Sequence, residues 1–310
     1  MSNTLNNNHC GNELDKSNDY AVIDCKLCKF KHLSPIPTDE NINKFYQNQY
    51  YQTHKNQYIK VDHQELSYGK IFFDERLDFF EKNTKGNRLL DVGCGAGFFL
   101  DQARKRGWNV FGVEPSKIAA NFAIENFKIK VFNQTFDLFY KTNYQKFDVI
   151  HLKNVLEHVP DPEKVLSLCY ELLQSNGLLY VEVPNDYNII QKIGVLIARE
   201  KNHWVCIPDH INYFNFVSIK RLLKKNGFKI LQQSTTFPMY ISLCIGQNFV
   251  KNKLAGKKMH QFRKKFELFF ENHKLGFARQ FIYRFLSKLY IGRTAIIYCK
   301  KAENHSIEVL

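Results

Sequence analysis

The sequence predicts an alternating α/β fold around a mostly parallel sheet. Short apolar runs that fit buried strands alternate with longer amphipathic runs that fit helices over residues 86–236. This alternation favours a parallel sheet with helices on both faces. A glycine-rich turn, Asp91–Gly97, separates the first strand from the first helix. The chain of 310 residues has room for this core and for further segments on either side of it.

The glycine-rich turn follows a strand that begins at Arg88 and precedes a helix that begins at Phe98. Glycines in such a turn let a ligand approach the backbone closely, and the helix N-terminus faces that ligand. The second strand, Trp108–Val113, ends at Glu114, which lies 23 residues after Asp91. An acidic residue at this position is typical of one that binds the hydroxyls of a ribose. The two strands therefore predict a site for a nucleoside-containing cofactor.

The spacing of the glycines argues against a dinucleotide. In the dinucleotide fingerprint G-x-G-x-x-G, counted from Gly93, the third glycine would fall at Phe98. The turn instead has glycines at 93, 95 and 97, with Asp91 before them. A carboxylate there would repel a pyrophosphate but suits a cationic amino-acid group. An NAD-dependent oxidoreductase is therefore disfavoured.

The later elements continue the same alternation. The helix that begins at Glu163 is expected to reach Gln174 and to stop at Asn176-Gly177, which is a C-terminal stop signal. Further strands are expected at Ile129–Phe136, Phe147–Leu152, Leu178–Pro184, Phe228–Gln233 and Arg293–Cys299, and further helices at Tyr187–Arg199 and Val217–Lys225.

Two segments of this core resemble those of one family. The turn Asp91–Gly97 resembles the first motif of class I S-adenosylmethionine-dependent methyltransferases, and Asn154–Pro162 resembles their "xxvLEHvpdP" signature. The resemblance covers roughly residues 86–185. It implies a Rossmann-like sheet of seven strands with an antiparallel last strand, and S-adenosylmethionine as the cofactor.

The resemblance also implies roles for single residues. Asp91 and the turn order the methionine end of the cofactor, Glu114 binds the ribose, and the end of the third strand contacts the adenine. The expected cofactor residues are Asp91, Gly93, Cys94, Gly95, Gly97, Glu114, Thr135 and Phe136.

The best candidate for a general base lies in the loop 204–214, which is expected above the carboxyl edge of the sheet. The pattern Asp209-His210-x-x-Tyr213-Phe214 resembles the "E-H-x-x-Y-F" segment of nucleotide-sugar C-methyltransferases, in which a histidine-centred cluster is implicated in proton abstraction. We therefore expect catalytic roles for His210, Asp209 and Tyr213, with Asp209 orienting the imidazole. The alternative is a histidine that only stabilises its own loop.

Two other histidines compete for this role. A cluster similar to Glu157-His158 binds a divalent metal in ubiquinone-pathway O-methyltransferases, where an "E-x-x-E-H" motif supplies the ligands. Asn154 replaces the first acid here, so a structural role for His158 is favoured. His203, beside Trp204, is a weaker candidate.

Cysteines near the N-terminus indicate a zinc-binding segment. Cys25 and Cys28 have the spacing of a zinc knuckle, and Cys10 precedes them. The segment resembles the N-terminal zinc ribbon of a group of bacterial sugar and small-molecule methyltransferases, which has four cysteines. We expect Cys10, Cys25 and Cys28 to bind structural zinc, with His9 or His32 as the fourth ligand. The alternative is a degenerate ribbon that packs without metal.

The net charge of +14 is concentrated near the C-terminus. Residues 251–293 hold twelve basic and two acidic residues, and their phenylalanines recur at helical spacing. A helical hairpin with solvated lysines and a peripheral membrane contact both explain this segment. Nucleic-acid binding is not expected, because no RNA-binding motif accompanies the charge.

The sequence thus predicts five segments: a zinc-ribbon-like segment (1–38), a helical cap (39–85), the methyltransferase core (86–236), a basic helical insert (237–292), and the last strand with a tail (293–310). We expect methyl transfer to a small acceptor, foremost a sugar or sugar nucleotide. Alternatives are a membrane quinone or lipid-like phenol as acceptor, or a non-catalytic nucleotide-binding protein. The polar N-terminus without an apolar stretch predicts a cytoplasmic location. The basic segment 251–293 adds peripheral membrane contact as an alternative to a purely cytoplasmic protein.

Overall fold

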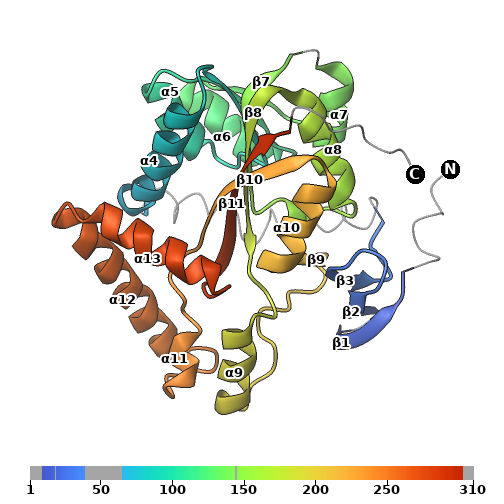
Figure 1. Cartoon of the computed structure of the whole chain (residues 1–310), viewed down its shortest axis with the longest axis vertical. Coiled ribbons are helices and arrows are strands. Elements are labelled where there is room, and N and C mark those ends of the chain that lie inside the picture. The colour runs from blue at the N-terminus through green and yellow to red at the C-terminus, as the bar shows by residue number, and fades with distance from the viewer. Residues whose placement is uncertain (1–8, 18, 39–64, 144, 303–310) are drawn as a thin grey trace.

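The computed structural model describes residues 9–17, 19–38, 65–143 and 145–302. Most of the expected cap, residues 39–64, lies outside these described residues. Within them, a seven-stranded mixed sheet forms the centre of the molecule, in the order β10-β11-β8-β7-β4-β5-β6 (Figure 1). Its strands are β4 (Arg88–Val92), β5 (Asn109–Val113), β6 (Lys130–Phe132), β7 (Phe147–Lys153), β8 (Leu173–Pro184), β10 (Phe228–Ser234) and β11 (Thr294–Lys301).

The strand directions confirm the expected sheet. β6, β5, β4, β7 and β8 run parallel to one another, and β11 pairs antiparallel with both β8 and β10. Because consecutive side chains of a strand point to opposite faces, Leu89 and Leu90 enter two different cores. The strands of the parallel part are apolar on both faces, as a doubly covered sheet requires.

Helices cover both faces of the sheet. On the face of Leu89 lie α4 (Leu66–Asn83) and α5 (Phe98–Lys105), which contribute the buried side chains of Leu77, Phe80 and Leu100. On the face of Leu90 lie α7 (Phe136–Thr142), α8 (Pro162–Leu172) and α10 (Phe216–Lys225). Helix α6 (Lys117–Phe127) connects β5 to β6.

The expected end of the helix after Pro162 was wrong. Helix α8 ends at Leu172, and β8 begins at once with Leu173, whose buried side chain joins the core. The pairing with β7 is interrupted after Leu173 and resumes at Leu178; between them Gln174, Ser175 and Asn176 are exposed, whereas Gly177 is buried. Asn176 adopts a positive φ of 65° in this interruption. The pair Asn176-Gly177 does mark a turn, but this turn lies in the irregular first part of β8 rather than at the end of a helix.

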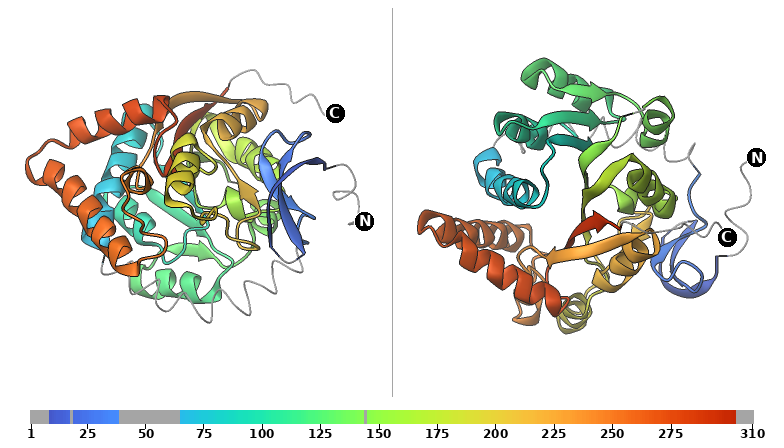
Figure 2. Two further views of the ribbon diagram at one scale, coloured as in Figure 1. Left: turned by 90° about the horizontal axis from the view of Figure 1, so that it is seen from below. Right: turned by 45° about the horizontal axis from the view of Figure 1, so that its top comes forward.

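A second, smaller sheet joins the N-terminal segment to the core. Strands β1 (Gly11–Ser17), β2 (Tyr20–Cys25) and β3 (Lys31–Ser34) pair antiparallel, and β9 (Asn212–Tyr213) adds a fourth strand to β3. Strand β9 belongs to the loop 204–214, which carries the candidate base. The N-terminal sheet and the helical insert lie at opposite ends of the molecule (Figure 2).

The segment between β10 and β11 is helical. It contains α11 (Ile241–Cys244), α12 (Lys253–Asn272) and α13 (Gly276–Lys288), and α11 packs on α9 (Ile189–Ala198). Two buried charges fix the α12–α13 hairpin. Glu267 accepts hydrogen bonds from the hydroxyls of Tyr68 and Tyr283, and Arg279 contacts carboxylate oxygens of Glu75 and Glu271, each at 2.6 Å. No described helix is both long and apolar enough to span a bilayer.

Candidate active site

A cavity of about 2050 Å³ lies at the carboxyl ends of the parallel strands. Its walls are formed by the glycine-rich turn, the loops after β5, β7 and β8, the loop 204–210, and the inner faces of α12 and α13. Sites for a single small ligand commonly measure about 300–1,000 Å³. The cavity therefore has room for a cofactor and an acceptor together.

The glycine-rich turn leaves open space where a ligand approaches. Gly93, Gly95 and Gly97 all have positive φ, from 55° to 79°. A Cβ atom on Gly97 would lie 2.7 Å from Cβ of Ala123, so this glycine is required for packing. A Cβ atom on Gly95 would meet nothing within 4 Å. Gly95 thus keeps its backbone accessible from the cavity.

Asp91 belongs to a buried chain of polar groups. Nδ1 of His151 lies 2.7 Å from Oδ1 of Asp91, and the guanidinium of Arg76 lies 2.9 Å from Nε2 of the same imidazole. Because arginine only donates, Nε2 is the acceptor and Nδ1–H donates to Asp91. Burial lowers the pKa of His151, in agreement with a neutral ring. This chain fixes the Asp91 carboxylate and leaves it at the cavity wall.

Glu114 is held by the turn that it faces. One carboxylate oxygen accepts a hydrogen bond from the backbone N–H of Gly95 at 2.9 Å, and the other accepts from Ser116 at 2.8 Å. Its side chain is 4 % exposed, at the edge of the cavity. Thr135 precedes α7 as its N-cap residue, and Thr135 and Phe136 both line the same cavity beyond Glu114. All eight expected cofactor residues are therefore gathered on this wall.

His210 and Asp209 line the same cavity, beside the short helix Leu156–His158. The rings of His158 and His210 are 5.0 Å apart, and Nδ1 of His158 lies 2.8 Å from the carbonyl oxygen of Asp209. Glu157, His158 and His210 each offer one ligand-type atom, and these atoms lie within 4.8 Å of one another. Asp209 thus contacts His158 rather than orienting His210.

The protonation states of this cluster differ sharply. Burial, and next the charge of His158, lower the pKa of His210 to about 4. Burial alone would lower the pKa of His158, but Asp209 and Glu157 raise it to about 9. Burial raises the pKa of Glu157 to about 7. Near neutral pH, His210 is therefore a neutral imidazole beside a cationic His158. Among the described residues, Nδ1 of His210 has no hydrogen-bond partner.

Tyr213 does not reach the cavity. Its side chain is 1 % exposed and packs in a cluster with Tyr187 and Trp204, behind the loop that carries His210. A direct catalytic role for Tyr213 is therefore not supported, and we assign it to packing of the loop. His203 lines the cavity and packs against Trp204 and Tyr240, with ring centroids 5.4 Å from each.

Sequence reasoning missed Asp186. This residue follows β8, is 3 % exposed and lines the cavity, and burial raises the pKa of its carboxyl to about 8. Its Oδ2 atom has no hydrogen-bond partner among the described residues. The signal that could have found it is the same as for Asp91 and Glu114: an acid just beyond the carboxyl end of a parallel strand.

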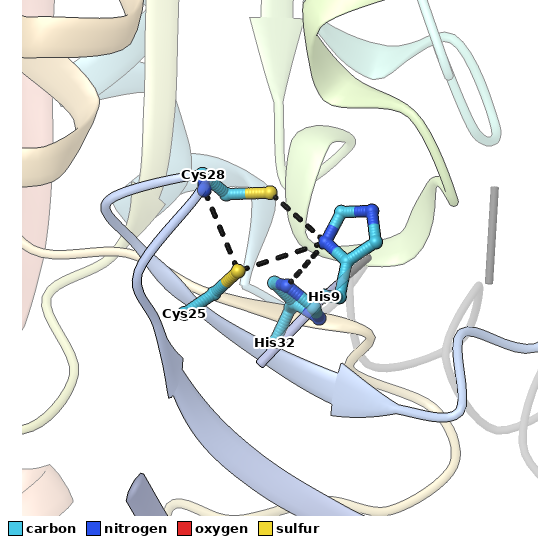
Figure 3. Close-up of side chains that lie close together, drawn as sticks. All are labelled: His9, Cys25, Cys28 and His32. Atoms are coloured by element: carbon cyan, nitrogen blue, oxygen red, sulfur yellow. Dashed lines mark hydrogen bonds between the residues drawn. The ribbon is translucent and has the colours of Figure 1, made fainter. Parts of the chain in front are cut away.

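The N-terminal sheet brings together His9, Cys25, Cys28 and His32 (Figure 3). Nδ1 of His9 lies 3.6 Å from Sγ of Cys25, 3.3 Å from Sγ of Cys28 and 3.2 Å from Nε2 of His32. Around a tetrahedral zinc ion, nitrogen and sulfur ligands are separated by about 3.5 Å and two nitrogens by about 3.3 Å. The four atoms thus have the spacing of a closed zinc site.

Two further contacts suit a metal. Nδ1 of His32 lies 2.8 Å from the carbonyl oxygen of Leu33, which directs Nε2 toward the cluster. Burial and the neighbouring Cys25 raise the pKa of the Cys28 thiol to about 12, so a thiolate pair here requires a cation. The expected ligand Cys10 is exposed and lies outside the cluster. Both histidines, rather than one, complete the set, because the start of β1 directs His9 inward.

The fold and the cavity define the class as a Rossmann-like class I methyltransferase fold. Residues 63–233 match the family model described as a methyltransferase domain, which is more than half of the chain. The chain therefore belongs to the methyltransferase domain family.

Curated relatives match the same part of the chain. It is 34 % identical over 122 residues to a ubiquinone biosynthesis O-methyltransferase of Actinobacillus pleuropneumoniae serotype 7 (strain AP76), covering 36 % of this chain and 52 % of the relative. It is 30 % identical over 166 residues to the protein of that name from Aliivibrio fischeri (strain ATCC 700601 / ES114), covering 51 % of this chain and 70 % of the relative. The chain spans about half the length of the first of these relatives.

Solved structures share the fold at low sequence identity. The magnesium protoporphyrin IX methyltransferase from Synechocystis PCC 6803 has a TM-score of 0.52 at 13 % identity, over 85 % of this chain and 100 % of that chain. An S-adenosylmethionine-dependent methyltransferase from Archaeoglobus fulgidus has a TM-score of 0.50 at 18 % identity, over 75 % and 94 %. At such identities the likeness shows the fold alone.

Proposed function

We propose that this protein transfers a methyl group from S-adenosylmethionine to a small-molecule acceptor. The observation that carries the proposal is the placement of two fixed carboxylates on either side of an open glycine backbone. Asp91 is held by His151, Glu114 is held by the N–H of Gly95, and the Gly95 backbone faces the cavity. Family membership supports the same activity.

Each fixed group has a role toward the cofactor. The Asp91 carboxylate attracts the cationic amino group of the methionine end, and Glu114 accepts hydrogen bonds from ribose hydroxyls. The bound sulfonium supplies an activated methyl group. The protein then has to hold the acceptor in line with it and remove a proton where the acceptor carries one.

His210 is the proposed base. Its neutral ring, with Nδ1 unpartnered among the described residues, lines the same cavity as the glycine-rich turn. The nearby charge of His158 disfavours a second cation, so a proton taken by His210 must pass on to another group. Glu157 and bulk water are available for that transfer.

A hydroxylated acceptor, such as a sugar or sugar nucleotide, is our leading proposal. Buried polar atoms of the cavity lining lack partners among the described residues, including Oε2 of Glu157, Oδ2 of Asp186 and Nε1 of Trp204. A buried polar group is costly to leave unpaired. Hydroxyl groups both donate and accept, so a polyhydroxylated molecule can satisfy carboxylates and an indole N–H together.

A quinone or lipid-like phenol is the second candidate acceptor. Two observations favour it: the names of the curated relatives, and the Glu157–His158–His210 donor set, which a divalent cation can use. Activity that requires Mg²⁺ or Zn²⁺ and disappears with a chelator would favour the phenol. Chelator-resistant activity would favour the base mechanism and the sugar.

The deciding experiment for the cofactor is calorimetric titration of S-adenosylmethionine, S-adenosylhomocysteine and NADH into the purified protein. We expect micromolar binding of both sulfur ligands and none of NADH. Absence of binding by either sulfur ligand, with and without cavity-sized sugars present, would contradict the proposed activity. It would leave the non-catalytic alternative.

We also propose that zinc occupies the His9–Cys25–Cys28–His32 cluster. The site is closed by four protein ligands, so its role is structural. It supplies no open coordination position for chemistry.

The helical insert is proposed to contact an anionic membrane surface. Helix α12 exposes Leu254, Phe262 and Phe269, and α13 exposes Phe277, Phe281 and Phe285. Lysines of the same helices, such as Lys265 on α12 and Lys288 on α13, are exposed among them. Apolar side chains mixed with basic ones are typical of interfacial helices.

Vesicle flotation tests this contact. The protein should float with vesicles of phosphatidylglycerol and phosphatidylcholine, and less with phosphatidylcholine alone. Replacement of Phe277, Phe281 and Phe285 by serine should abolish flotation. Absence of flotation by the wild type would reject the membrane contact. Self-association that the same substitutions remove would instead assign this surface to a second copy of the chain.

A further inference from the structure

Two arginines and a histidine gather on the wall of the cavity that the insert forms. The guanidinium groups of Arg263, on α12, and Arg293, just before β11, each lie 3.9 Å from Sδ of Met239. A further guanidinium nitrogen of Arg263 lies 3.0 Å from Nδ1 of His260. All four side chains line the same cavity as Gly95 and His210.

These two positive charges are poorly neutralised. The nearest carboxylate oxygen to Arg263 in the described part of the chain is Oε2 of Glu267, at 4.0 Å, and that carboxylate already accepts from two tyrosine hydroxyls. Glu65 lies 3.8 Å from His260 but is engaged by Lys264 at 2.8 Å. No described carboxylate lies within ion-pair distance of Arg293. A thioether is a weak acceptor, so Met239 satisfies neither guanidinium.

Burial makes this arrangement costly without a ligand. The Arg263 side chain is 14 % exposed, and its Nε atom has no hydrogen-bond partner among the described residues. Burial and the charge of Arg293 lower the pKa of Arg263, which reflects the repulsion between the two cations. A group that carries negative charge and several acceptor oxygens would offset the repulsion between the two arginines and would give the buried guanidinium of Arg263 hydrogen-bond partners.

We propose that Arg263 and Arg293, with His260 beside them, bind a phosphate or diphosphate group carried by the acceptor. This inference rests on the proposed function, because it places the phosphorylated end of the acceptor in one part of the cavity and its reacting end near His210. Guanidinium forks match phosphate oxygens in geometry and charge. The chemistry is shared by nucleoside diphosphates and by isoprenoid diphosphates, which are two kinds of carrier that a sugar acceptor can be attached to.

The test uses the full-length protein and soluble probes. Inorganic pyrophosphate, uridine diphosphate and farnesyl diphosphate are titrated calorimetrically at two salt concentrations into the wild type and three variants. Arg263→Gln and Arg293→Gln should each weaken pyrophosphate binding by about tenfold or more, as expected for loss of a charge-assisted contact. Lys258→Gln, which removes an equal charge from an exposed position on α12 outside the cavity, should leave binding unchanged.

The outcomes separate this proposal from the cofactor proposal. Arg293 is exposed, so its variant should fold even if Arg263→Gln is unstable, which thermal melting will show. Tighter binding of uridine diphosphate than of pyrophosphate would support a nucleotide-linked acceptor, and tighter binding of farnesyl diphosphate a lipid-linked one. Equal pyrophosphate affinity in Arg293→Gln and Lys258→Gln, or none in the wild type, would overturn the subsite. The affinity for S-adenosylmethionine should be the same in these variants as in the wild type. If the wild type does not bind S-adenosylmethionine, the proposed activity is rejected instead.

Discussion

Two carboxylates at the ends of adjacent strands are held in place by different kinds of group. Asp91 is fixed by a side chain, His151, whereas Glu114 is fixed by the backbone of the turn opposite it. Glu114 therefore does two things: it orders the Gly95 peptide and presents a carboxylate edge to the cavity. Its removal should affect the shape of the turn as well as the ligand.

Glu114→Ala should weaken S-adenosylmethionine binding by roughly 1–3 kcal/mol, the cost of losing hydrogen bonds to a charged group. The measurement is calorimetric titration. Glu125→Ala, an exposed acid on α6, is the control of equal charge. An unchanged affinity in Glu114→Ala would remove this residue from the cofactor site.

His210→Ala should lower turnover by about 10²–10⁴, the usual contribution of a general base, with little change in cofactor affinity. Single-turnover rates with the identified acceptor measure this. Wild-type rates would assign the proton transfer to another group, of which Glu157 and His158 are nearest.

The pH profile should have limbs set by two histidines. The pKa of His210 is lowered to about 4, so its neutral form persists, and activity with it, until the pH falls toward 4. The pKa of His158 is raised to about 9. The stability that its positive charge contributes is therefore fully present below the pKa of a histidine in the unfolded chain, and it is lost as the pH rises through 9. In His158→Gln the alkaline limb should vanish and the acid limb should move up in pH. If the pH profiles of the wild type and His158→Gln, both measured with a chelator present, do not differ, the proposed coupling between the two histidines is contradicted.

At the scale of elements, the N-terminal sheet supports the loop that carries His210. β3 pairs with β9 through Lys31↔Tyr213 and His32↔Asn212, and the backbone N–H of Leu33 donates to the carbonyl of Ile211. Ile211 in turn donates to the carbonyl of Glu157 at 2.7 Å. His32, a ligand of the proposed zinc site, is therefore one strand away from the loop that carries the proposed base.

Cys25→Ser should abolish stoichiometric zinc and increase amide hydrogen exchange in residues 206–214, because β3 loses its metal anchor. Cys10→Ser is the matched control and should change neither, since Cys10 lies outside the cluster. Metal analysis and exchange mass spectrometry provide the two readouts. Zinc-free wild type with a protected loop would favour a ribbon that packs without metal.

The elements show why some features could be predicted and others could not. The strand–turn–helix around Gly95 and the acids at the strand ends depend on local sequence, so they could be predicted. The strand β9 has two residues and exists only through pairing with β3, far away in the chain, so no periodicity could predict it. Asp186 was missed as a site residue, and Cys10 was expected in the place that the second histidine takes, because these positions depend on how β8 ends and where β1 begins.

At the scale of the whole molecule, one cavity collects residues from nearly every segment. The core supplies the wall proposed to bind the cofactor, the loop 204–210 supplies His210, and the insert supplies Arg263. The family model ends at residue 233, so the wall formed by α12 and α13 lies outside the part shared with the family. The fold class was predicted from the sequence because it rests on repeated local patterns. The wall formed by α12 and α13 was not predicted, because it is built by contacts between distant segments.

The place of β11 in the sheet has a consequence for synthesis. β11 lies between β8 and β10, although both of these strands precede it in the chain. A chain emerging from the ribosome therefore presents two unpaired strand edges, with apolar residues beside them, until residues 294–301 appear. The helical hairpin α12–α13 emerges during that interval, because it lies between β10 and β11 in the chain. We therefore expect closure of the sheet to come late, and a chain that lacks residues 294–301 to expose both edges to chaperones and proteases.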